Sequence, residues 1–144
     1  MLLTDSNIDI AKLVSQIKRH EGFSKTPYAD TEGYTTIGYG RNLDTVGLRH
    51  DEAQLMLEND IAKAIEYLEQ YPWWPELDGS RQRAMADMMF NLGPGGFATF
   101  KRMIACLHRC DYEGARKEMI DSKWFKQVGR RAKYNADLMK GDAQ

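Results

Sequence analysis

Residues 21–40 decide the fold: they run Glu21-Gly22-Phe23-Ser24-Lys25-Thr26-Pro27-Tyr28-Ala29-Asp30-Thr31-Glu32-Gly33-Tyr34-Thr35-Thr36-Ile37-Gly38-Tyr39-Gly40. Before them, apolar residues recur at helical spacing from position 8 to position 17. Gly22 is the residue type that commonly ends a helix. After it, residues 34–39 are rich in β-formers and residues 31–33 have turn chemistry. The stretch therefore predicts a helix that ends at Glu21, followed by a small β-hairpin.

Two acidic residues frame this stretch. Glycoside hydrolysis needs one carboxylic acid that protonates the leaving oxygen and one carboxylate that acts on water or on the sugar. A helix C-terminus and partial burial both favour the protonated form of Glu21, which suits a general acid. Asp30 lies among hydroxyls and backbone donors, which suits an ionised base, and the hydroxyl of Thr36 is placed to help it hold a water. By composition alone, two unrelated surface acids are the simpler explanation of such a pair, because a chain of this length contains many acids at similar spacing.

The rest of the chain is predicted to be helical. Apolar periodicity marks helices over residues 52–71, 80–92, 98–110, 112–119 and 130–139, with a short connector at 123–125. There are no internal repeats or low-complexity linkers, and 144 residues suit one domain. We expect a mainly α, α+β fold over residues 1–144: a small N-terminal β-lobe, a long helix, a larger helical lobe, and a cleft between the lobes.

Composition excludes several classes of protein. No run approaches the roughly 20 apolar residues of a membrane span, and the N-terminus lacks the features of a secretory signal, so a cytoplasmic location is expected. Cys106 and Cys110 are four residues apart in a predicted helix, which favours buried free thiols over a disulfide or a metal pair. His108 points to a different face of that helix. No metal and no cofactor are expected.

The net charge of −1 conceals an asymmetry. Residues 1–100 carry 9 Lys and Arg against 15 Asp and Glu, and residues 101–144 carry 11 against 6. A basic C-terminal part indicates contact with something anionic, such as a cell wall, a membrane surface or nucleic acid. A solvated charged face explains the same composition as well.

The spacing within residues 21–40 closely resembles that of the phage-type lysozymes of glycoside hydrolase family 24. In that family a Glu, eight residues, an Asp, five residues and a Thr form the catalytic triad, which Glu21, Asp30 and Thr36 match without a gap. The resemblance continues through residues 51–60, 90–100 and 122–133. It implies a lysozyme-like fold and a muramidase that hydrolyses the β-1,4 bond between N-acetylmuramic acid and N-acetylglucosamine in peptidoglycan.

The resemblance also implies supporting residues. Phe90 would line the substrate groove, and Glu32, Tyr39 and Gly40 would help bind substrate. Arg131 would pair with the catalytic Glu21, favouring its ionised form and opposing the effects of burial and the helix dipole.

This chain departs from the family in two places. Arg41 stands where the family's best-known member has a histidine paired with an acid at the position of Asp60. An Arg41–Asp60 pair would keep that contact without titrating near neutral pH. The segment between Arg41 and Asp51 is also shorter, so binding residues from that region are not transferred.

The function implied is a monomeric endolysin that reaches the wall with the help of a holin, lyses the host and releases phage. It would leave the host cytoplasm to act on the periplasmic cell wall, with glycan strands rather than nucleic acid as its partner. Three alternatives are a lytic transglycosylase, which needs the acid alone, a virion-associated lysozyme, and an envelope-disrupting protein. The last would act through Lys123, Lys126, Arg130, Arg131, Lys133 and Lys140.

Overall fold

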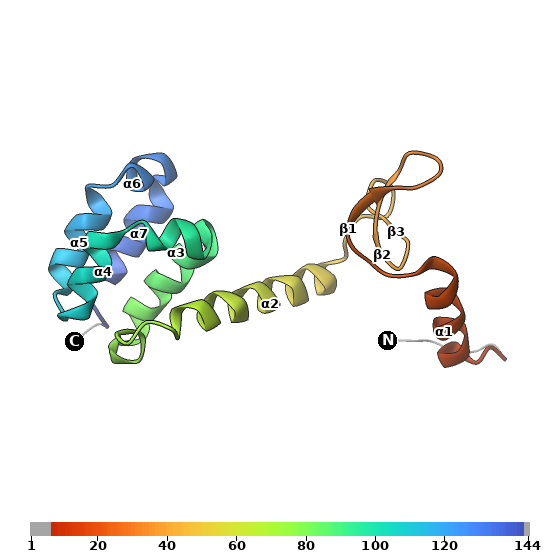
Figure 1. Cartoon of the computed structure of the whole chain (residues 1–144), viewed down its shortest axis with the longest axis horizontal. Coiled ribbons are helices and arrows are strands. Elements are labelled where there is room, and N and C mark those ends of the chain that lie inside the picture. The colour runs from red at the N-terminus through yellow and green to blue at the C-terminus, as the bar shows by residue number, and fades with distance from the viewer. Residues whose placement is uncertain (1–6, 143–144) are drawn as a thin grey trace. The chain divides into compact units, whose positions relative to one another are not determined.

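The computed structural model describes residues 7–142. The chain divides into two compact units, Met1–Ala53 and Gln54–Gln144. The first is called the β unit because it holds the sheet, and the second is called the helical unit. The mainly helical α+β class predicted from the sequence is confirmed, and the elements follow one another as drawn in Figure 1.

The β unit begins with helix α1, Ile10–Glu21. Asp9 caps its N-terminus, since its side chain accepts a hydrogen bond from the amide of Lys12 at 3.0 Å. Gly22 ends the helix with a φ of 69°, and its amide donates to the carbonyl of Lys18. The predicted helix end is therefore confirmed, and Glu21 is the last helical residue.

A three-stranded antiparallel sheet follows, in the order β1-β2-β3. The strands are β1, Ser24–Ala29, β2, Thr35–Gly38, and β3, Arg41–Asn42. Tyr28 lies opposite Thr36 in the first pair, and Ile37 lies opposite Arg41 in the second. The predicted hairpin is confirmed, and the short third strand brings the turn at residues 38–40 back along β2.

Helix α2, His50–Leu68, starts in the β unit and continues into the helical unit. A short 3-10 turn, Trp74–Glu76, precedes α3, Gly79–Ala98. At Gly93 the backbone leaves helical geometry, with φ 74° and ψ 170° just before Pro94. The helix is thus divided where the Gly-Pro sequence predicts an end.

Four shorter helices complete the helical unit. They are α4, Lys101–His108, α5, Tyr112–Ile120, α6, Lys123–Val128, and α7, Arg130–Leu138. The connector expected at residues 123–125 is helical instead. Its cause is the cap at Ser122, whose hydroxyl accepts a hydrogen bond from the amide of Phe125 at 3.2 Å.

The core of the helical unit is rich in methionine. Methionine fills irregular gaps because its side chain is unbranched and flexible. The fully buried large side chains of this core include Leu68, Met85, Met88, Phe97, Met103, Leu107, Met119 and Met139. Both cysteines are free as predicted, but only Cys106 is buried, and Cys110 is exposed. Over residues 7–142, no helix is long and apolar enough to cross a membrane.

Candidate active site

Glu21 stands at the negative end of the α1 dipole. The last turn of α1 also carries Lys18, Arg19 and His20, basic residues that suit a helix C-terminus. Glu21 is exposed on the β unit, so this unit by itself does not supply the partial burial that the sequence predicts. Its position therefore follows from where the helix ends and from what its side chain touches.

The Glu21 side chain lies directly against Gly40. A Cβ added to Gly40 would lie 2.7 Å from Oε2 of Glu21 and 2.9 Å from its Cδ. Gly40 also has a φ of 79°, a left-handed value that other residues rarely adopt. The left-handed turn between β2 and β3 thus favours glycine at position 40, and the absence of a Cβ leaves the space that the Glu21 carboxyl group occupies.

Asp30 is held at the turn that follows β1. Its Oδ1 accepts hydrogen bonds from the amides of Glu32 and Tyr34, both at 2.9 Å. The backbone closes the same turn, because the amide of Asp30 donates to the carbonyl of Tyr34 at 2.8 Å and the amide of Gly33 donates to that of Asp30 at 3.0 Å. Oδ2 has no hydrogen-bond partner among residues 7–142, which leaves one oxygen of an oriented carboxylate able to accept from water.

Thr36 lies on β2 and is buried, with 4% of its surface exposed. Its hydroxyl donates to the carbonyl of Tyr34 at 3.0 Å. Asp30 and Thr36 are therefore anchored on one residue, since Tyr34 donates its amide to the first and accepts from the second. With its proton committed in this way, the Thr36 oxygen presents only lone pairs to a further partner.

The structure pairs Arg41 with Glu52, and the expected contact of Arg41 with Asp60 stays a prediction because Asp60 belongs to the other unit. Nη1 of Arg41 donates to Oε1 of Glu52 at 2.7 Å, and Nη2 pairs with Oε2. This hydrogen bond lowers the pKa of Glu52 to about 2 and raises the pKa of Arg41. Glu52 is the nearer acid in the chain and lies in the first turn of α2 within the same unit, whereas Asp60 belongs to the helical unit.

The other predicted binding residues of the β unit differ in their surroundings. Glu32 is exposed in the turn after β1, where its amide helps to hold Asp30. Tyr39 is 45% exposed and tilts against Phe23, with ring centroids 5.4 Å apart. The ammonium of Lys18 lies 5.1 Å from the centroid of the Tyr39 ring. The Tyr39 ring is thus partly covered by groups of this chain.

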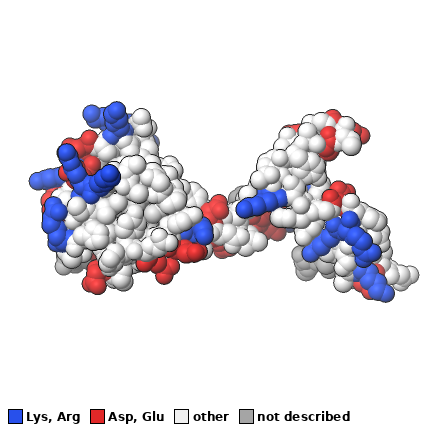
Figure 2. Space-filling model, viewed as in Figure 1, with Lys and Arg blue, Asp and Glu red and all other residues white. Residues whose placement is uncertain are grey.

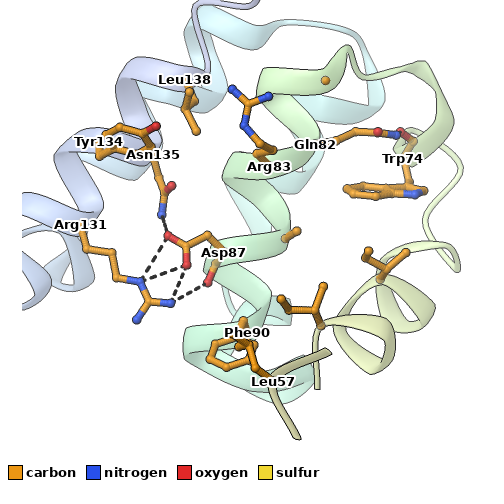
Figure 3. Close-up of a pocket in the computed structure, with 14 residues that line it drawn as sticks. Leu57, Trp74, Gln82, Arg83, Asp87, Phe90, Arg131, Tyr134, Asn135 and Leu138 are labelled. Carbon is orange, nitrogen blue, oxygen red and sulfur yellow. Dashed lines mark hydrogen bonds and ion pairs between the residues drawn. The ribbon is translucent and has the colours of Figure 1, made fainter. Parts of the chain in front are cut away.

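Phe90 and Arg131 line a groove of about 640 Å³ in the helical unit. Figure 3 shows Phe90 and Leu57 near one another, and Arg131 beside Asp87 and Asn135. Nη2 of Arg131 contacts Oδ1 of Asp87 at 2.6 Å, and Nδ2 of Asn135 donates to Oδ2 of Asp87 at 2.7 Å. Burial raises the pKa of Asp87, but the hydrogen bonds from Arg131 and Asn135 outweigh it, so the net shift is downward.

The partner that the structure gives Arg131 is therefore Asp87, and its pairing with Glu21 stays a prediction. Nε and Nη2 of Arg131 face Asp87, while Nη1 has no hydrogen-bond partner within residues 7–142. Neither Asp87 nor Glu52 was identified from the sequence. Asp87 lies 44 positions from Arg131, so no local sequence pattern indicates the pair. For Glu52 the only sequence signal is a weak one, its position as an acid in the first turn of a helix.

The predicted site residues are divided between the two units. The predicted residues Glu21, Asp30, Glu32, Thr36, Tyr39, Gly40 and Arg41 all belong to the β unit. Asp60, Phe90 and Arg131 belong to the helical unit. Among the residues that the structure describes, no group of three or more His, Cys, Asp or Glu side chains is arranged to hold a metal ion.

Comparison with known proteins gives consistent matches. The pattern of the phage lysozyme family matches residues 18–138. The pre-baseplate central spike protein Gp5 of Enterobacteria phage T4 is 28% identical, over 98% of this chain and 30% of that protein. Probable T4-type lysozymes 1 and 2 of Dictyostelium discoideum are each 26% identical, over 85% of this chain and 90% of theirs. The chain thus spans under a third of the spike protein and most of the two lysozymes.

Proposed function

We propose, from the premise that this chain belongs to the phage lysozyme family, that Glu21, Asp30 and Thr36 together hydrolyse the glycan strands of bacterial peptidoglycan. The family makes the chain a lysozyme-type cell-wall hydrolase. The proposal adds the bond, which is the β-1,4 linkage between N-acetylmuramic acid and N-acetylglucosamine, and the role of each residue.

Glu21 is the general acid of this proposal. It donates its proton to the glycosidic oxygen as the bond to the anomeric carbon breaks, so that N-acetylglucosamine leaves with a free hydroxyl. The end of α1 supports this role, since it fixes the backbone from which the Glu21 side chain projects. Contact with Gly40 holds the carboxyl group at a defined place on the turn between β2 and β3.

Asp30 and Thr36 position the attacking water, and the observation that carries the proposal is their common anchor on Tyr34. A water that donates one hydrogen to Oδ2 of Asp30 and the other to Oγ1 of Thr36 directs its own lone pair outward. Because the Thr36 proton is already donated to the Tyr34 carbonyl, this hydroxyl accepts from the water. Asp30 takes one water proton as the oxygen bonds to the anomeric carbon, and the net change is the addition of one water.

This arrangement separates hydrolysis from lytic transglycosylation. A transglycosylase closes the sugar on itself and has no use for a residue pair that holds water. The family resemblance further implies inversion at the anomeric carbon, in which base and acid act from opposite faces of the sugar.

The decisive experiment is mass analysis of glycan ends released from purified peptidoglycan in water enriched in oxygen-18. We expect reducing N-acetylmuramic acid ends that carry the label. Glu21→Gln and Asp30→Asn should each remove this release. Anhydro ends, or full release by Glu21→Gln, would overturn the proposal.

Thr36 offers a matched pair of variants. Thr36→Ser keeps the hydroxyl and should retain most activity, whereas Thr36→Val keeps the shape and loses the acceptor for the water. Equal activity of the two variants would remove Thr36 from the mechanism.

Host lysis, passage from the host cytoplasm with a holin, and monomeric action remain part of the proposal. The basic C-terminal region is proposed only as an aid to binding the anionic envelope. Figure 2 shows its Lys and Arg side chains interspersed with Asp and Glu on the helical unit. Three of the six cations, Arg131, Lys133 and Lys140, have carboxylate partners. A killing assay with Glu21→Gln separates the roles, because a catalytically dead variant that still kills acts through the envelope.

A further inference from the structure

Glu52 is an acid that the proposed mechanism does not use. Its carboxylate nevertheless accepts three hydrogen bonds from groups of the β unit. Its Oε1 accepts from Nη1 of Arg41 at 2.7 Å and from the amide of Arg49 at 2.8 Å, and its Oε2 accepts from Nη2 of Arg41. Both side chains of the pair are about one third exposed. A two-pronged pair of this kind fixes direction as well as distance, because the guanidinium fork matches the two carboxylate oxygens.

Arg41 ties three parts of the β unit together. Its backbone opens β3 opposite Ile37 of β2. Its Nη1 also donates to the carbonyl of Gly47 at 3.0 Å, within the loop that leads to α2. Through Glu52 it reaches the first turn of α2. The sheet, the loop and the helix start are thus joined at one guanidinium group.

The residue before Arg41 is Gly40, the one on which the Glu21 side chain lies. On one side Gly40 is joined through Tyr39 to Gly38, the last residue of β2. The φ angle is 79° at Gly40 and 68° at Gly38. On the other side it is joined to Arg41. A turn with two left-handed glycines has little stiffness of its own, because glycine adopts many backbone conformations. The pair with Glu52 supplies stiffness at its second end.

We infer that Glu52 is a positioning residue for the general acid, acting through Arg41 and the backbone of Gly40 to hold the surface against which Glu21 rests. The inference rests on the proposed function of Glu21. It assigns a role to a charged pair that is local to the β unit, eleven residues apart in the chain. Because arginine does not titrate near neutral pH, its charge stays available to this pair there.

The test compares Glu52→Gln and Glu52→Ala with Asp51→Asn. Asp51 is the neighbouring acid in the same turn of α2, but it pairs with the Arg49 side chain and is 71% exposed. We expect Glu52→Gln and Glu52→Ala to lower kcat about 10-fold or more with little change in KM, since small displacements of catalytic groups cost large factors in rate. Asp51→Asn should keep the wild-type kcat.

A double-variant cycle distinguishes positioning from mere folding. Arg41→Ala, Glu52→Ala and the double variant should lose the same factor in kcat, because either single change already breaks the pair. Glu52→Asp, which keeps the charge, should recover part of the rate lost by Glu52→Ala. Circular dichroism and thermal unfolding confirm that the rates are taken on folded protein.

Wild-type kcat in folded Glu52→Gln and Glu52→Ala would overturn the inference, as would multiplicative losses from Arg41→Ala and Glu52→Ala. Glu21→Gln is measured in parallel. If Glu21→Gln is inactive and the Glu52 variants are fully active, only this inference fails. If Glu21→Gln hydrolyses peptidoglycan normally, the proposed function itself fails.

Discussion

Replacing Gly40 by alanine tests whether Glu21, the proposed general acid, depends on one close contact. The new methyl group would lie 2.7 Å from Oε2 and 2.9 Å from Cδ of Glu21. Carbon atoms in contact prefer about 3.5–4.0 Å, so the carboxyl group must move by on the order of 1 Å. A misplacement of about 1 Å in an active site can cost roughly 100-fold in rate. We therefore expect kcat to fall by about that factor.

The same substitution also has a cost in stability. Holding an alanine at a φ of 79° costs about 1–2 kcal/mol relative to ordinary backbone conformations. For a protein of this size that lowers Tm by roughly 2–8 °C. The clash itself adds little, because the far end of the Glu21 side chain can rotate away. Activity and stability are thus expected to change by very different amounts.

The assay is the initial rate of glycan cleavage on soluble peptidoglycan strands, at a temperature where every variant is folded. Gly129→Ala is the control, because Gly129 has a φ of 69° with no neighbour within 4 Å of its added Cβ. It should lose stability and keep the wild-type kcat. A wild-type kcat in Gly40→Ala would refute the reasoning, and a rise in KM alone would make Gly40 a substrate contact instead.

Three further outcomes are expected. The ionised form of Glu52 stabilises the fold above about pH 4.5, and this contribution is lost as the pH falls toward the Glu52 pKa of about 2. The free energy of unfolding of Glu52→Gln in urea should therefore depend less on pH over that interval than that of the wild type. The same pH dependence in both proteins would contradict this prediction. Asp87→Ala should destabilise the helical unit by about 1–3 kcal/mol, because Arg131 and the buried Asn135 lose their acceptor; unaltered chemical denaturation would show that the cluster contributes nothing. Met88→Ala should lower the free energy of unfolding by about 2–5 kcal/mol, as truncation of a fully buried core side chain does. Its kcat at low temperature should stay that of the wild type. A much smaller loss of unfolding free energy would mean that the methionine core collapses around the gap.

Local sequence signals predicted the elements that carry the candidate site. The apolar spacing of α1 and the glycine at position 22 predict that Glu21 lies at a helix end. This prediction succeeds because helix periodicity and capping depend only on residues within a few turns of one another. The turn residues 31–33 and the β-formers after them predict the hairpin for the same reason. The prediction of a connector at residues 123–125 is wrong, because the cap at Ser122 outweighs the short length of α6.

The spacing of Glu21, Asp30 and Thr36 predicts the residues of the proposed mechanism, but it carries no information on how their side chains are held. That Asp30 and Thr36 share Tyr34 depends on the closed turn and on the register of β2, which are properties of the paired strands.

Side-chain partners distant in the chain were decided by the tertiary structure alone. Arg41 binds Glu52 and Arg131 binds Asp87 because packing brings these groups together, and a periodic pattern says which face is apolar without saying which charges meet. The sequence by itself determined the order of helix, hairpin and helical body and the three candidate catalytic residues. Only the folded chain decided that Glu21 lies on Gly40, since that contact depends on where the turn between β2 and β3 meets the end of α1.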